Sequence, residues 1–176
     1  MRSALVTGGR GFVGAWLCRG LLERGVEVRS FDRRGPHVRP SSLGMLGVAD
    51  EVVELEGNLR DGELLRGALA DGSVDTVFHL AAETIVGTVQ ADPLAGFETN
   101  VGGTWTLLEA CRAESIARVV VASSDKAYGA HDRLPYREDF ALQPTAPYEA
   151  SKAAADLIAR SYWPSFGLPV AVTRFA

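Results

Sequence analysis

The sequence predicts an α/β fold, a doubly wound parallel sheet with helices on both faces in three α/β/α layers. Short β-branched runs alternate with longer helical patterns along the whole chain, which is typical of repeated β-α-β units. The strand-like runs are nearly all apolar, as expected of strands covered on both faces. The 176 residues are 47% hydrophobic and 23% charged, without an internal repeat, a low-complexity linker or a break in composition, which indicates one globular domain.

The predicted elements alternate regularly from the first residues onward. The expected strands are Ala4–Thr7, Val26–Phe31, Glu51–Leu55, Thr76–Leu80, Arg118–Ala122 and Pro169–Thr173. The helices between them are expected to begin near Phe12, Ser42, Arg60, Pro93 and Pro147. Two long connections remain, Arg33–Ser41 and Gly129–Thr145, and loops of this size in a compact domain are often functional. The second follows the carboxyl end of a strand, where open α/β sheets bind ligands.

Charge and cysteine content argue against several classes of protein. A formal net charge of −4 is opposite to that of most nucleic-acid-binding domains, and Arg33, Arg34 and Arg39 are few enough to form a solvated loop. Cys18 and Cys111 each lie in an apolar helical pattern, with neither metal-ligand nor disulfide spacing. No segment has the pattern of a signal peptide or a membrane span, so we expect a cytoplasmic protein without a metal, membrane or nucleic-acid partner.

The segment between the first predicted strand and the first predicted helix carries a dinucleotide-binding pattern. The glycines of Thr7–Gly14, which reads TGGRGFVG, fit both the G-x-G-x-x-G and the G-x-x-G-x-x-G spacing. Glycine lets the backbone turn sharply and approach a pyrophosphate, and the helix start offers unpaired N–H donors. A P-loop is excluded because no Gly-Lys-Ser/Thr follows. The candidate phosphate-binding residues are Gly8, Gly11, Phe12, Val13 and Gly14.

Asp32 stands at the end of the second predicted strand, close to the offset expected for the carboxylate that binds an adenosine ribose. An aspartate there favours the ribose diol of NAD and repels the 2′-phosphate of NADP. NAD is therefore the expected cofactor and NADP the less favoured one, although Arg33 and Arg34 can weaken this preference. The alternative is that Asp32 is only a solvated loop residue.

Tyr148 and Lys152 stand four residues apart at the start of a predicted helix, so both side chains project from one face. A nearby ammonium favours the phenolate, and it can bring a tyrosine pKa from about 10 into the range of general-base catalysis. The spacing is common by chance, and its weight here comes from the dinucleotide turn upstream. Ser123–Lys126 lies at the carboxyl end of the fifth predicted strand, where parallel sheets bind ligands. The alternative is that these residues only cap or turn the chain.

Several segments, taken in order, resemble the motifs of the extended short-chain dehydrogenase/reductase family over the whole chain. They are Thr7–Gly14, His79–Ala82, Asn100–Thr104, the cluster around Ser124, and the pair Tyr148 and Lys152. The resemblance implies a Rossmann fold that binds NAD and a nucleotide-sugar substrate. It implies further cofactor contacts from Arg33, Asn58, Leu59, Leu80, Ala81, Ala82, Thr84, Asn100, Ala122, Ser123, Tyr148 and Lys152. Asn58 stands where the family usually has an aspartate near the adenine.

Within the family, Ser123–Gly129 and Thr84–Thr88 most resemble the CDP-glucose 4,6-dehydratases. The dTDP-glucose enzymes carry Asp-Glu where this chain has Asp125-Lys126. Glu83 stands where the CDP-glucose enzymes usually have glutamine.

The resemblance implies an internal redox cycle with five catalytic residues. Tyr148, activated by Lys152 and oriented beside Ser124, takes the proton of the sugar C4 hydroxyl while hydride leaves C4 for NAD. Asp125 protonates the departing C6 hydroxyl, and Lys126 assists removal of the C5 proton. The hydride then returns to C6, so the cofactor is regenerated and the product is a 4-keto-6-deoxy sugar nucleotide.

Family members continue past the sixth strand with a smaller domain that holds the sugar, whereas this chain ends at Ala176. We therefore expect residues 1–176 to form the NAD-binding domain without the substrate domain, and to turn over poorly or not at all. A sugar epimerase or reductase of the same fold remains open. So does a non-catalytic dinucleotide-binding or dimerising module, which would be indifferent to Tyr148→Phe. The resemblance also implies a homodimer through the helices that start near Pro93 and Pro147.

Overall fold

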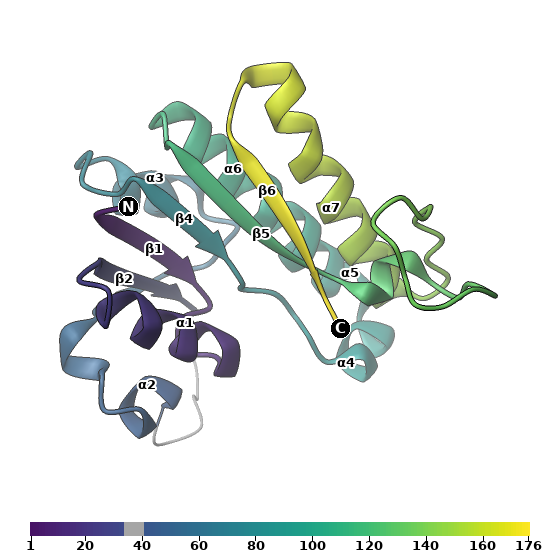
Figure 1. The fold of residues 1–176 in the computed structure, drawn as a ribbon, viewed down its shortest axis with the longest axis horizontal. Coiled ribbons are helices and arrows are strands. Elements are labelled where there is room, and N and C mark those ends of the chain that lie inside the picture. Colours follow the sequence, from purple (N-terminus) through teal and green to yellow (C-terminus); the bar gives the residue numbers. More distant parts are fainter. Residues whose placement is uncertain (34–40) are drawn as a thin grey trace.

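A six-stranded parallel sheet in the order β3-β2-β1-β4-β5-β6 runs through the centre of the molecule (Figure 1). This computed structural model describes residues 1–33 and 41–176, so Arg34, Arg39 and most of the Arg33–Ser41 loop lie outside the described residues. The strands are β1 (Ser3–Thr7), β2 (Glu27–Asp32), β3 (Val53–Glu56), β4 (Thr76–His79), β5 (Arg118–Ser124) and β6 (Val170–Phe175). The strand order reverses between β1 and β4, which confirms the predicted doubly wound α/β fold.

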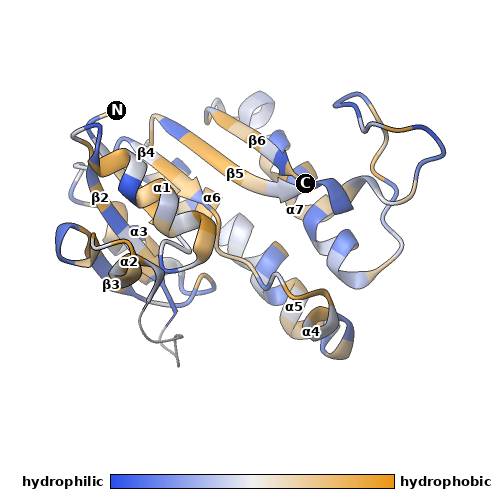
Figure 2. Ribbon diagram, turned by 60° about the horizontal axis from the view of Figure 1, so that its bottom comes forward, coloured by the Kyte–Doolittle hydropathy of each residue, from blue (hydrophilic) through white to orange (hydrophobic). Residues whose placement is uncertain are grey.

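Helices cover both faces of this sheet. They are α1 (Phe12–Leu22), α2 (Ser42–Met45), α3 (Gly62–Leu69), α4 (Val86–Ala91), α5 (Pro93–Phe97), α6 (Gly103–Ala113) and α7 (Pro147–Phe166). Successive residues of β1 point to opposite faces, so Leu5 joins one core with α3, α6 and α7, and Ala4 and Val6 join the other with α1 and α2. Figure 2 shows the hydrophobic colouring on the inner strands. Cys18 and Cys111 are fully buried in these two cores, as their sequence patterns predict.

The two edges of the sheet depart from the expectation that every strand is covered on both faces. Val53 in β3 is 56% exposed, and Ala171 in β6 is also exposed. The expected third strand was placed two residues too early, because Ala49–Glu51 forms a 3-10 turn before β3. An edge strand has one neighbour and less helix above it, so an apolar sequence there does not ensure burial.

The helix expected from Pro93 is interrupted by a π-helical segment, Glu98–Gly102, between α5 and α6. The Thr104 hydroxyl donates to the carbonyl of Asn100 at 2.6 Å, so the widened turn keeps a partner for that carbonyl. Such segments are rare and are often found at functional sites. The short helix α4 was not predicted, because it spans only Val86–Ala91 and has little apolar periodicity.

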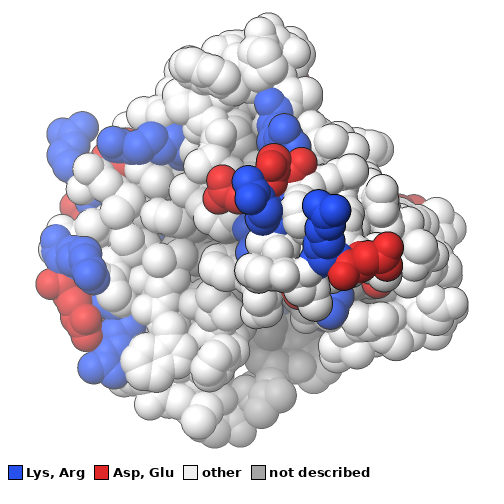
Figure 3. All heavy atoms as spheres, turned by 45° about the vertical axis from the view of Figure 1, so that its right-hand side comes forward, with Lys and Arg blue, Asp and Glu red and all other residues white. Residues whose placement is uncertain are grey.

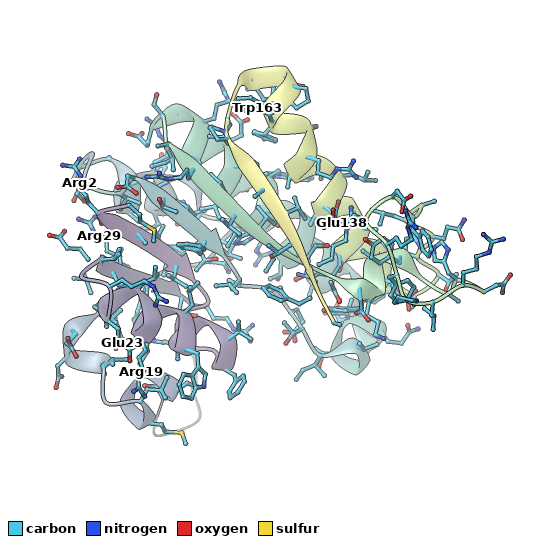
Figure 4. The ribbon with its side chains drawn as sticks, in the orientation of Figure 1. Arg2, Arg19, Glu23, Arg29, Glu138 and Trp163 are labelled. Carbon is cyan, nitrogen blue, oxygen red and sulfur yellow. The ribbon has the colours of Figure 1, made fainter. Side chains whose placement is uncertain are left out.

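The loop between β5 and α7 lies against the end of β6. This loop includes Glu138, which is labelled in Figure 4. Arg174 of β6 donates to the hydroxyl of Tyr128 at 2.7 Å and to the Glu138 carbonyl at 3.3 Å. The same guanidinium binds the fully buried carboxylate of Asp156 through two bonds, of 2.7 and 3.1 Å. One arginine therefore holds the loop, the last strand and α7 together.

Basic and acidic side chains are interspersed on the face shown in Figure 3. Within the described residues, no helix combines the length and the hydrophobicity needed to cross a membrane.

Candidate cofactor-binding and catalytic site

The turn between β1 and α1 has the close backbone packing that a phosphate-binding loop requires. Gly8 adopts φ +77°, and a Cβ there would lie 2.8 Å from the backbone nitrogen of Ala81. A Cβ at Gly14 would overlap the carbonyl oxygen of Gly8. Gly11 is the N-cap of α1, where no side chain of the described residues caps the helix start. Phe12 and Val13 follow it on the surface, so the helix N-terminus is open to an anion.

Asp32 is fixed at the carboxyl end of β2 beside this turn. Its carboxylate accepts the backbone N–H of Arg10 at 3.0 Å and the hydroxyl of Ser30 at 2.8 Å. Asp32 is thus the last residue of β2 and is hydrogen-bonded within the fold, and its binding of a ribose stays a prediction. Through these two hydrogen bonds, the Asp32 carboxylate connects β2 to the glycine turn.

A pocket of about 290 Å³ lies beside Asp32 and is lined by Arg33, Glu56, Gly57 and Asn58. The side-chain oxygen of Asn58 accepts the backbone N–H of Arg60 at 3.0 Å. The next residue, Leu59, is buried in the core and does not line this pocket. The structure thus brings Arg33 and Asn58 together at one pocket, whereas the side chain of Leu59 packs in the hydrophobic core.

The segment after β4 forms the opposite wall of the glycine turn. Leu80 donates its N–H to the carbonyl of Thr7 at 3.1 Å, and Ala81 donates to the Thr7 hydroxyl at 3.3 Å. Leu80, Ala81 and Ala82 are half-buried, and Thr84 is exposed. The backbone of this segment therefore faces Gly8 directly.

His79 links this wall to the π-helical turn through bonds that the sequence did not reveal. The Thr7 hydroxyl lies 2.7 Å from Nδ1 of His79, and Nε2 lies 3.0 Å from the Thr104 hydroxyl. Because the Thr104 proton goes to the Asn100 carbonyl and the Thr7 oxygen accepts from Ala81, the bonds fit a neutral histidine protonated on Nε2. Burial, and then the charge of Lys152, lower the pKa of His79 to about 3.

Asn100 uses its side chain within the protein. Its Oδ1 accepts the N–H of Glu83 at 2.7 Å, and its Nδ2 donates to the Glu83 carbonyl at 3.1 Å and to the Ser151 hydroxyl at 2.9 Å. Asn100 is 3% exposed. Its place in the site is therefore that of a positioning residue, which ties the loop after β4 to α7.

Tyr148 is buried at the start of α7, next to Ser124, the last residue of β5, and Asp125, which follows it. Burial raises the pKa of Tyr148, its hydrogen bond with Ser124 acts in the opposite direction, and the charge of Asp125 raises the pKa further. The Ser124 hydroxyl also donates to the Asp125 carboxylate at 3.2 Å. The sequence thus predicted that these three residues lie close together, and the structure places a phenol, a hydroxyl and a carboxyl group side by side.

Lys152 lies on the same helix, but it does not lower the pKa of Tyr148 as the spacing suggested. Its ammonium donates to the carbonyl of Ala122 at 2.8 Å, and burial lowers its pKa to about 8. Lys126 is exposed. Desolvation of the phenol outweighs the hydrogen bond with Ser124, which favours the phenolate.

The residues present fit a bound dinucleotide in two independent ways. The glycine turn leaves space that a Cβ would fill, at a helix start that attracts phosphate. At the other end, the hydroxyl of Ser123 is buried without a hydrogen-bond partner among the described residues. A buried hydroxyl without a partner is costly, and a ligand amide or hydroxyl can satisfy it.

Comparison with known proteins gives the same framework. A family model described as GDP-mannose 4,6 dehydratase matches residues 5–176. UDP-glucose 4-epimerase from Halalkalibacterium halodurans is 32% identical over 97% of this chain and 49% of its own length. CDP-glucose 4,6-dehydratase from Salmonella typhimurium is 35% identical over 96% of this chain and 47% of its own length. The chain spans about half the length of these curated relatives.

The solved structures include a double-mutant dTDP-glucose 4,6-dehydratase from Streptomyces venezuelae with NAD bound. It superimposes with a TM-score of 0.89 at 37% identity, covering 99% of this chain and 55% of that chain. The likeness therefore extends over the sheet, the glycine turn and the helix that carries Tyr148. The chain belongs to the extended short-chain dehydrogenase/reductase family of nucleotide-sugar epimerases and dehydratases.

Proposed function

We propose that this chain is the NAD-binding and catalytic-residue-bearing domain of a nucleotide-sugar 4,6-dehydratase of the CDP-glucose type. The observation that carries the proposal is the group formed by Tyr148, Ser124 and Asp125, in which a carboxyl group accompanies the phenol. Oxidation of a sugar hydroxyl needs one base, whereas elimination of water also needs an acid for the departing hydroxyl. Asp125 supplies that second group.

The glycine turn and the start of α1 would hold the pyrophosphate of NAD, and Asp32 with the Asn58 pocket would hold its adenosine. Ser123 and Lys152 would contact its nicotinamide half. Ser123 lies near the end of β5, and Lys152 of α7 donates a hydrogen bond to the neighbouring Ala122 carbonyl. Bound there, NAD would supply the hydride acceptor for C4 and the hydride donor for C6. Relatives crystallised with NAD support this assignment.

The side chains then divide the proton transfers among themselves. Tyr148 takes the proton of the C4 hydroxyl, and the hydroxyl of Ser124 orients the phenol by hydrogen bonding. Asp125 protonates the C6 hydroxyl as it leaves, and Lys126, which is exposed, assists removal of the C5 proton. The raised pKa of Tyr148 keeps the phenol protonated until a bound ligand changes its surroundings.

An epimerase is the second candidate, and a specific observation favours it, because UDP-glucose 4-epimerases match the chain about as well as dehydratases do. An epimerase would use Tyr148 and Lys152 but would need no acid at C6. Asp125 therefore separates the two functions, and its position beside Tyr148 favours the dehydratase.

The chain spans about half of the length of these relatives, and hydride transfer requires the sugar to be held precisely. We therefore propose that the isolated chain binds NAD but turns over slowly. The exposed apolar side chains of Leu94 and Trp105, on α5 and α6, and of Leu157, on α7, support a homodimer through these helices.

The test is a single-turnover reaction, with the chain in excess over CDP-glucose and NAD present, followed by mass spectrometry of the nucleotide sugar. A dehydratase yields a product that lacks one water, and Asp125→Asn abolishes that loss while Tyr148→Phe abolishes all conversion. A product of unchanged mass and inverted C4 would instead establish the epimerase. Binding of NAD without either product, unaffected by Tyr148→Phe, would indicate a non-catalytic module.

A further inference from the structure

The arginine of the glycine turn points back onto the sheet. The guanidinium of Arg10 forms a salt bridge with Glu54, and its Nη1 lies 3.6 Å from Oε1 of Glu56. Its backbone N–H donates to Asp32, as described above. The Arg10 side chain is only 16% exposed, so this contact is packed and not a loose surface pair.

Strand pairing brings these acidic residues to one place. In the pairing of β2 with the edge strand β3, Glu54 lies opposite Ser30 and Glu56 lies opposite Asp32. Three carboxylates from two strands therefore accompany one guanidinium. Burial lowers the pKa of Arg10, but the hydrogen bond and charge of Glu54, with the charges of Asp32 and Glu56, outweigh burial and raise it.

The same carboxylates border the pocket assigned to the adenosine. Glu56 lines that pocket together with Arg33 and Asn58. In Rossmann folds an arginine near the ribose accommodates a 2′-phosphate, and the acidic residue after the second strand prefers the free diol. Arg10 is the arginine whose backbone contacts Asp32, yet its charge is directed to Glu54 and Glu56.

We propose that Glu54 and Glu56 determine cofactor specificity, because they hold Arg10 away from the ribose and place negative charge where a 2′-phosphate would lie. The inference rests on the NAD-binding function proposed above. It assigns the exclusion of NADP to a pair of glutamates on β3 as well as to Asp32. A phosphate dianion gains nothing from an arginine that two carboxylates already neutralise, and it is repelled by all three acids.

The experiment compares NAD and NADP binding by calorimetric titration of the unmodified chain and four variants. Glu54→Gln/Glu56→Gln removes both carboxylates, and the triple variant with Arg10→Gln also removes the arginine. The control, Glu27→Gln/Glu63→Gln, changes the net charge equally at two exposed positions, one of them at the opposite end of β2. Thermal unfolding of each variant checks folding, and Glu56→Gln alone provides a milder change if the double variant is unstable.

We expect the ratio of NADP to NAD affinity to rise about tenfold in the double variant, through tighter NADP binding. Glu56→Gln alone gives part of that gain. The triple variant keeps only the smaller part that comes from lost repulsion, because no arginine is released toward the phosphate, and the control leaves the ratio unchanged. An unchanged ratio in folded Glu54→Gln/Glu56→Gln, or an equal gain without Arg10, would overturn the inference while NAD binding stands. Failure of the folded, unmodified chain to bind NAD would overturn both this inference and the proposed function.

Discussion

The side-chain amide of Asn100 donates a hydrogen bond of 2.9 Å to the hydroxyl of Ser151, and so joins the π-helical turn to the helix that carries Tyr148. The Ser151 hydroxyl in turn donates to the carbonyl of Tyr148 at 2.7 Å. The other bonds of Asn100 hold the backbone of Glu83. One buried side chain therefore sets the distance between the loop after β4 and the proposed catalytic helix.

Asn100→Ala is expected to lower the free energy of unfolding by about 2–4 kcal/mol, because one buried and two partly buried hydrogen bonds are lost. Urea unfolding followed by circular dichroism measures this loss. The exposed Asn58 is the matched control, and Asn58→Ala is expected to change stability by less than about 0.5 kcal/mol. Equal effects of the two substitutions would contradict the role given to Asn100.

His79 predicts a pH dependence of stability. Its pKa is lowered from 6.5 to about 3 in the fold, so between these values the unfolded chain binds one more proton than the folded chain. The free energy of unfolding therefore rises with pH across this window, by up to about 1.4 kcal/mol per pH unit from this residue. As the pH falls below about 6.5, that stability is lost.

The measurement is urea unfolding at several pH values between 4.5 and 7, on the unmodified chain and on His79→Gln. Glutamine keeps an N–H donor for Thr104 but does not titrate, so the slope of stability against pH should become shallower. If both proteins lost stability equally with falling pH, His79 would not be the buried neutral group described here.

Lys152 is expected to reduce stability at neutral pH. Its pKa is lowered from 10.5 to about 8 in the fold, so at pH 7 a charged ammonium is buried with one carbonyl partner. Lys152→Met should raise the free energy of unfolding by about 1–3 kcal/mol at pH 7, and the advantage should shrink as pH rises from 8 to 10.5. Lys126→Met, at an exposed lysine, is the control and should be nearly neutral. A Lys152→Met variant less stable than the unmodified chain at pH 7 would refute this.

Gly14→Ala and Gly20→Ala compare two glycines of the same helix. A Cβ at Gly14 would overlap the backbone of Gly8, whereas a Cβ at Gly20 meets only the Arg24 guanidinium, at 3.5 Å. We expect Gly14→Ala to destabilise the chain by about 2 kcal/mol or more and to weaken NAD binding at least tenfold. Gly20→Ala should be neutral or stabilising by up to about 1 kcal/mol. Similar NAD affinities for both variants would argue against the turn as the phosphate site.

The sequence pattern was sufficient to predict the doubly wound parallel sheet, the glycine turn and the residues that lie next to Tyr148. These features depend on residues close in sequence or on the alternation of strands and helices. The helix break at Glu98–Gly102 could not be predicted, because its widened turn is stabilised by the side chain of Thr104. The helix α4 is too short for its apolar residues to show a helical spacing.

The electrostatics of the site were harder to predict than its location. Arg10 and Glu54 are 44 residues apart, and the pairing of β1 with β2 and of β2 with β3 brings them together. The pKa of Tyr148 was expected to fall because of Lys152, yet burial raises it. Spacing along a helix gives the direction of two side chains, but desolvation depends on everything packed around them.

Calorimetric titration of the folded, unmodified chain with NAD tests whether the glycine turn and Asp32 bind the cofactor. We expect saturable binding at one site, strongly weakened in Gly14→Ala and retained in Gly20→Ala. Absence of NAD binding by a chain whose circular dichroism shows the α/β fold would contradict the assignment of the glycine turn and Asp32 to the cofactor.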